Sequence, residues 1–192
     1  MRVRIAAVVG ILALTVGAGA SERGTATATV EGKQVTIDYG RPALKGRPLA
    51  ELLKQLPDDG IWRAGDDVVT TLTTDTNLAI GDKKIAKGKY SIYVHVSEKG
   101  DRALVVNKDL GQPLKNIWKE APADQANLAW PHLEGYEKSI AKKEVARIPL
   151  RKEAAAEVRD LFTIALTPSK EGAVLNLAWG DESWSIDVKP TK

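Results

Sequence analysis

The chain has 192 residues, and its 28 basic and 25 acidic residues give a formal net charge of +3 at pH 7. It contains no cysteine, which excludes disulfide bonds and a lipid-modified cysteine at the N-terminus. Without residues 1–20 the balance falls to 26 basic and 25 acidic residues, which gives no support for a nucleic-acid partner.

Residues 1–20 have the layout of a secretory signal peptide. Two early arginines precede an apolar run at residues 5–16, and Ala-Gly-Ala at residues 18–20 supplies a signal-peptidase site. The apolar run is too short to cross a bilayer. We expect an exported protein, periplasmic or extracellular, that begins at Ser21 and has no membrane span after cleavage. The alternative is a retained N-terminal anchor.

Most of the remaining chain shows the period of two that is typical of half-buried β-strands. In residues 33–39, for example, Val35, Ile37 and Tyr39 share one face. The segments with this pattern are 33–39, 68–74, 90–96, 103–107, 145–150, 161–167, 173–179 and 183–188. We predict a mainly β fold, an antiparallel sandwich or barrel, in one domain over residues 21–192 with its core at about 33–188.

Three segments interrupt the β pattern. Pro48 precedes leucines at helical spacing in residues 49–56, and residues 152–160 hold three alanines flanked by charges. We predict a short helix in each. Residues 108–139 are irregular and contain three prolines. A long connection of this kind is often functional, so this segment is a candidate lid.

Two tryptophans near the C-terminus are predicted to lie in the core. Trp179 shares a strand face with Leu175 and Leu177, and Trp184 shares one with Ile186 and Val188. The turn between the two strands is tight, so we expect Trp179 and Trp184 to meet as a cross-strand aromatic pair.

Residues 38–63 carry the most suggestive group of polar and aromatic side chains. Arginines held on tight turns beside aromatic rings recognise carboxylates, phosphates or sugar hydroxyls. The alternative is that Asp38 pairs with one arginine and the group braces the loops. The candidate ligand-binding residues are Asp38, Arg41, Lys45, Arg47, Trp62 and Arg63.

Other known site chemistries find little support in the chain. The two histidines, His95 and His132, lie 37 positions apart without a carboxylate at metal-motif spacing. The sequence contains neither a nucleophile elbow nor a glycine-rich phosphate loop. We therefore expect no metal and no cofactor, and we assign no catalytic residue.

Residues 38–47 read Asp-Tyr-Gly-Arg-Pro-Ala-Leu-Lys-Gly-Arg, and residues 60–65 read Gly-Ile-Trp-Arg-Ala-Gly. These segments resemble the Asp-Tyr-x-Arg-Pro-x-x-Lys-Gly-Arg and Gly-x-x-Trp-Arg-x-Gly elements of an uncharacterised bacterial family, domain of unknown function 2911, with this chain slightly shorter in the second element. Residues 80–91 resemble its Gly-Lys-x-Leu-x-x-Gly-x-Tyr-Ser hairpin. The resemblance covers roughly residues 25–188 and implies an exported, mostly β domain, with no reaction assigned.

Three functions are compatible with these observations. The first is a non-catalytic exported domain that binds a small anionic or sugar-like ligand. The second is a structural or protein-interaction module of the envelope. The third is a hydrolase-like enzyme that uses Asp38 as acid or base with help from an arginine. The partner is accordingly an unknown small molecule or an envelope protein.

We predict that residues 1–20 are removed on export, because a small-residue site follows the short apolar run. N-terminal analysis or intact-mass measurement of the protein from its native envelope should find Ser21 as the first residue. A retained Met1 would contradict the prediction and make the segment an anchor.

Overall fold

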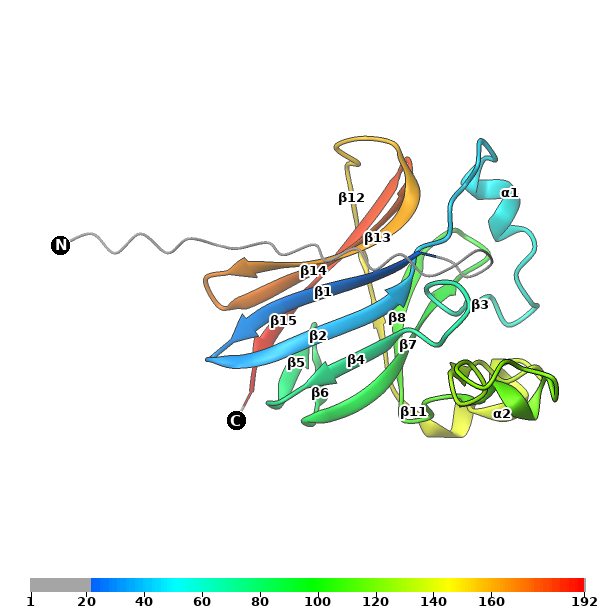
Figure 1. Cartoon of the computed structure of the whole chain (residues 1–192). Helices are drawn as coiled ribbons and strands as arrows, with labels where there is room; N and C mark the ends of the chain where they lie inside the picture. The colour runs from blue at the N-terminus through cyan, green and yellow to red at the C-terminus, as the bar shows by residue number, and fades with distance from the viewer. Residues whose placement is uncertain (1–21, 192) are drawn as a thin grey trace.

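The computed structural model describes residues 22–191, which form two antiparallel sheets packed face to face (Figure 1). The predicted signal peptide lies outside these residues. The first sheet has the order β1-β2-β4-β7-β8-β11, and β3 pairs with the far part of β7. Its strands are β1 (Arg23–Val30), β2 (Lys33–Gly40), β3 (Ile61–Trp62), β4 (Thr71–Thr74), β7 (Gly88–Val96), β8 (Arg102–Asn107) and β11 (Glu144–Pro149).

The second sheet has the order β13-β14-β15-β5-β6, and β12 pairs with β15. Its strands are β5 (Leu78–Ile80), β6 (Lys83–Ile85), β12 (Arg151–Glu153), β13 (Arg159–Ser169), β14 (Gly172–Gly180) and β15 (Glu182–Pro190). The remaining elements are α1 (Leu49–Leu53), α2 (Tyr136–Ser139), the 3-10 turns η1 (Leu114–Asn116) and η2 (Ala141–Lys143), and a small ladder of β9 (Gln112–Pro113) with β10 (Ala129–Trp130).

The predicted fold class, a mainly β antiparallel sandwich or barrel with one or two short helices, is confirmed: the structure has two antiparallel sheets and two short α-helices among the described residues. Alternating residues of each sheet face the space between the sheets and are buried there, such as Val35 and Ile37 of β2 and Leu175 and Leu177 of β14. Among the described residues, no helix is both long and apolar enough to cross a membrane. The strand β1, which the sequence pattern missed, forms one edge of the first sheet.

A second, smaller apolar cluster covers the outer face of the first sheet. Tyr93 of β7 and Val105 of β8 point away from the sandwich core and pack with Ile61, Tyr136 and Ile140. The irregular region after β8, which includes α2, covers this face at the right of Figure 1. The candidate lid segment is therefore packed against the sheet by its own buried side chains.

One of the two predicted helices is wrong. Residues 151–153 form β12, whose Lys152 lies opposite Trp184 of β15, and β13 begins at Arg159. Alanines favour a helix locally, but a two-turn helix is marginal without packing. Pairing with β15 satisfies the backbone hydrogen-bonding groups of residues 151–153, and this outweighs the local preference for a helix. The second helix is α2 instead.

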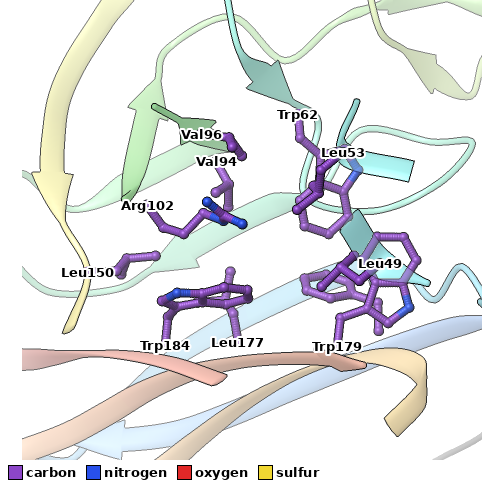
Figure 2. Close-up of a pocket in the computed structure, with 11 residues that line it drawn as sticks. Leu49, Leu53, Trp62, Val94, Val96, Arg102, Leu150, Leu177, Trp179 and Trp184 are labelled. Carbon is purple, nitrogen blue, oxygen red and sulfur yellow. The ribbon is translucent and has the colours of Figure 1, made fainter. Parts of the chain in front are cut away.

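Both C-terminal tryptophans are buried as predicted, but they do not pair with each other. The register places Trp179 opposite Glu182 and Trp184 opposite Leu177. Trp179 stacks on Trp62, with ring centroids 5.2 Å apart, and the Arg102 guanidinium lies 4.9 Å from the Trp184 ring (Figure 2). The residual cavity between these groups is about 10 Å³, too small for an organic ligand.

We predict that Trp179→Ala lowers the free energy of unfolding by roughly 3–5 kcal/mol, because Trp179 is buried and contacts both Trp62 and Phe162. Denaturant melts should show this loss. Trp118→Ala is the matched control, since Trp118 is 48% exposed and should cost less than about 1 kcal/mol. Equal losses for the two variants would refute the assigned core.

Candidate functional site

The first part of the predicted site braces the two sheets. Asp38 forms an ion pair with Arg23 of β1, whose Nε lies 3.1 Å from Asp38 Oδ1. Arg41 forms an ion pair with Glu22 and lies 3.4 Å from the Phe162 carbonyl oxygen of β13. These contacts match the bracing alternative, in which Asp38 is held by an arginine.

The loop after β2 folds back on itself through Lys45 and Arg47. The Lys45 backbone N–H donates to the Asp160 carboxylate at 2.9 Å, and Arg47 Nε donates to the Leu44 carbonyl at 2.9 Å. Gly40, at the start of the loop, is required because a Cβ there would come within 2.2 Å of the Asp66 carbonyl oxygen. The motif at residues 38–47 thus shapes a tight connection between the sheets.

The remaining predicted residues, Trp62 and Arg63, lie side by side in the chain but face different surroundings. Trp62 packs against the sandwich core, and an Arg63 Nη lies 3.4 Å from the Asp66 carboxylate. The three arginines of the candidate set therefore have separate contacts: Arg41 with β13, Arg47 with its own loop, and Arg63 with the loop after β3.

Trp62 and Arg63 do line a cleft of about 320 Å³ on the outer face of the first sheet, which we call the outer cleft. One wall is the connection from α1 to β3, and the other is the segment from β10 to α2, both at the right of Figure 1. The aromatic and polar side chains that line it are Asp59, Trp62, Arg63, Tyr93, Trp130, His132, Tyr136 and Ser139.

Asp109 holds the second wall of the outer cleft in place. Its Oδ1 accepts hydrogen bonds from the Gly111 backbone N–H at 2.8 Å and from His132 Nε2 at 3.0 Å. Its Oδ2 accepts from Lys143 Nζ at 2.8 Å. Burial alone would raise the pKa of Asp109, but these hydrogen bonds outweigh it and hold the pKa below its usual range.

A glycine allows this wall to approach the neighbouring loop. Gly111 has a φ of +85°, and a Cβ on it would come within 2.5 Å of the Trp130 carbonyl oxygen. The Val69 backbone N–H donates to the Ala129 carbonyl at 2.9 Å, which ties β10 to the loop before β4. Trp130 is therefore held at the edge of the outer cleft by backbone contacts.

A second polar network fixes α2. Asn107 Nδ2 donates to the Tyr136 hydroxyl and to the Ile140 carbonyl, both at 2.9 Å, and Tyr136 in turn donates to Glu144 at 2.9 Å. Arg147 donates to both carboxylate oxygens of Glu144. Burial raises the pKa of Tyr136, so its hydroxyl stays protonated and serves as a donor.

Tyr93 is the exception among these polar groups. Tyr93 is 4% exposed and is one of the residues that line the outer cleft, but its hydroxyl is buried and makes no well-formed hydrogen bond with residues 22–191. Burial raises the pKa of Tyr93 to about 12; interaction with the neighbouring Ser91 hydroxyl lowers it in part, and the charge of Asp109 raises it further. A buried donor without a good acceptor costs roughly 1–3 kcal/mol.

Sequence reasoning did not connect Asp109, His132 and Tyr93. His132 was weighed only as a zinc ligand, and Asp109, 23 residues away, belongs to no motif. Within residues 22–191, no group of three or more potential metal-binding side chains occurs. The one available signal was the position of His132 beside Trp130 in the irregular segment.

We predict that Asp109→Asn lowers the free energy of unfolding by roughly 2–3 kcal/mol at pH 7, because the charged acceptor of three hydrogen bonds is lost. The pKa of Asp109 is lower in the folded chain, so its contribution is present above the unfolded-state value of about 3.9. It disappears as the pH falls through the lower folded-state pKa. Denaturant melts at several pH values should therefore show wild type and variant converging in acid.

The matched control for this prediction is Asp124→Asn, which changes an exposed carboxylate in the same irregular region. It should leave the free energy of unfolding unchanged within about 0.5 kcal/mol. An Asp109→Asn variant as stable as this control at pH 7 would contradict the role assigned to Asp109.

Comparison with known proteins agrees with the motifs. No curated protein and no solved structure matches the chain. The family described as "Protein of unknown function (DUF2911)" matches residues 21–188, which covers nearly the whole chain. The match includes both sheets up to Val188 and every residue of the outer cleft. The chain therefore belongs to the DUF2911 family.

Proposed function

We propose that the chain is an exported, non-catalytic domain that binds a small anionic or sugar-like ligand in the outer cleft. The observation that carries the proposal is the outer cleft itself, which is about 320 Å³ in volume and brings the aromatic rings of Trp130 and Tyr136 together with the side chains of Arg63 and His132.

The size and lining of the outer cleft support a small ligand. Its volume of about 320 Å³ lies at the lower end of the range of small-molecule pockets. Partly buried Trp130 and Tyr136 offer apolar ring surfaces, and such surfaces pack well against a sugar ring or another flat molecule.

The polar groups of the outer cleft are mainly hydrogen-bond donors. Arg63 supplies a permanently charged guanidinium with 40% of its side chain exposed, and Tyr93 supplies a buried hydroxyl. The His132 imidazole, 24% exposed, already donates from Nε2 to Asp109. Asp59 also lines the cleft, but its Oδ1 already accepts from the Ile61 backbone N–H at 3.0 Å. This balance favours a ligand with oxygen acceptors, either an anionic group or hydroxyls.

Of the six candidate ligand-binding residues that the sequence indicated, only Trp62 and Arg63 line the outer cleft. Asp38 pairs with Arg23 and does not line the outer cleft, so the proposal gives it no role in ligand binding. Leu133, which lines the cleft and is 70% exposed, is the observation that favours the alternative, an envelope interaction module.

We predict that sugars, sugar phosphates or organic acids raise the melting temperature of the chain in a thermal-shift screen, since a ligand that binds the native state stabilises it. Tyr93→Phe should weaken binding of the best ligand by about 3- to 10-fold, the worth of one hydrogen bond. The same change should leave the melting temperature without ligand equal or higher, because it removes an unpaired buried group.

Arg63→Gln should weaken an anionic ligand and leave a neutral sugar unaffected. The matched control is Arg151→Gln, which removes an exposed arginine that pairs with Asp187 on the second sheet. If both Tyr93→Phe and Arg63→Gln bind the ligand with unchanged affinity, the ligand binds somewhere other than the outer cleft. A screen without any stabilising compound would contradict the proposal and favour the interaction module.

A further inference from the structure

The imidazole of His132 lies between the Asp109 carboxylate and the outer cleft. Its Nε2 is 3.0 Å from Asp109 Oδ1, and the ring itself lines the cleft. Because the pKa of Asp109 is lowered, this carboxylate is ionised at neutral pH and acts only as an acceptor. Nε2 therefore carries the hydrogen of that bond.

This arrangement leaves Nδ1 as the ring nitrogen for a ligand, since it makes no hydrogen bond with residues 22–191. In the neutral ring, with the hydrogen on Nε2, Nδ1 is a lone-pair acceptor and repels an oxyanion. In the protonated ring, Nδ1 is a charged donor and attracts one. An oxyanion therefore binds next to His132 only when Nδ1 of the ring is protonated.

Charged groups of both signs surround the His132 ring. Asp109 favours the protonated ring, but Lys143 on its other oxygen at 2.8 Å already neutralises much of that carboxylate. Across the cleft, Arg63 opposes the imidazolium and Asp59 favours it, while Tyr93 and Tyr136 are neutral donors.

We propose that the outer cleft binds an oxyanion group, such as a carboxylate, phosphate or sulfate, together with a proton that His132 takes up. Arg63 and the Tyr93 hydroxyl supply the other donors, so the bound anion faces three donors of which one depends on pH. The inference rests on the proposed function and adds its regulation, because binding of the anion is coupled to the uptake of a proton by His132 and is therefore favoured in acid.

The two histidines of the chain allow a direct test with sodium sulfate, an oxyanion that does not itself titrate between pH 6 and 8. Binding and protonation are reciprocal, so an anion that prefers the protonated ring raises the titration midpoint of His132. A sulfate concentration equal to the Kd of the protonated form raises that midpoint by about 0.3 pH unit, the logarithm of two. The readout is the NMR pH titration of both imidazoles.

His95 is the internal control, because it lies on β7 beside a neighbouring hollow and does not line the outer cleft. Sodium chloride at the same ionic strength is the second control. We expect sulfate to raise the midpoint of His132 relative to chloride and to leave that of His95 unchanged. Equal shifts of both midpoints would show a general ion effect and overturn the inference.

His132→Gln separates failure of the inference from failure of the proposed function. In wild type, sulfate should raise the melting temperature more at pH 6 than at pH 8, and His132→Gln should remove this difference. Sulfate binding that depends on Arg63 but not on pH would overturn proton uptake and leave the binding cleft intact. An absence of sulfate binding at both pH values would overturn this inference, whereas sugar binding that depends on Tyr93 would still uphold the proposed function.

Discussion

Strands β7 and β8 bury side chains on both of their faces, and the outer part of the structure follows from this constraint. Ile92 and Val106 face the sandwich core, while Tyr93 and Val105 face outward and are buried as well. An antiparallel sheet commonly leaves its second face to water, so these outward residues need a cover. The irregular region between β8 and β11 supplies it, with Tyr136 and Ile140 as its apolar contacts.

A cover made of loops and one-turn helices brings many backbone and side-chain polar groups against a buried surface. Asn107 and Asp109 at the end of β8 satisfy several of them, because each bonds to groups far along the chain. Hydrogen bonds of this kind are worth more where water is excluded, and leaving one unmade costs correspondingly more. The unpaired Tyr93 hydroxyl is therefore the feature most in need of a functional explanation.

The sequence pattern predicted the sandwich well because period-two alternation reports directly on which residues face a core. It identified the buried faces of β2, β14 and β15, including those of Trp179 and Trp184. It missed β1, where Ala26 and Ala28 are too small to give a strong apolar signal. It also assigned a helix where pairing with β15 draws residues 151–153 into a strand, a tertiary effect that local propensity does not contain.

The candidate site was harder to predict, since it is assembled from residues without motif spacing. Arg63 was found beside turn-forming residues, whereas Asp109 and His132 meet only because β9 and β10 pair and fold the segment back. The arginines of the family motif drew attention to residues 38–47, but Arg41 contacts the backbone of β13 and Arg47 contacts its own loop. Composition and residue spacing indicate local structure along the chain. They do not indicate a cleft that is formed by two loops far apart in the sequence.

A crystal structure of the chain with a bound oxyanion tests the central claim, that the outer cleft is the binding site, most directly. We expect an oxygen of the anion within hydrogen-bond distance of the Tyr93 hydroxyl, with Arg63 and His132 as its other donors. An anion bound instead at Arg41 or Arg47, with the outer cleft empty and the Tyr93 hydroxyl bonded within the protein, would contradict the claim.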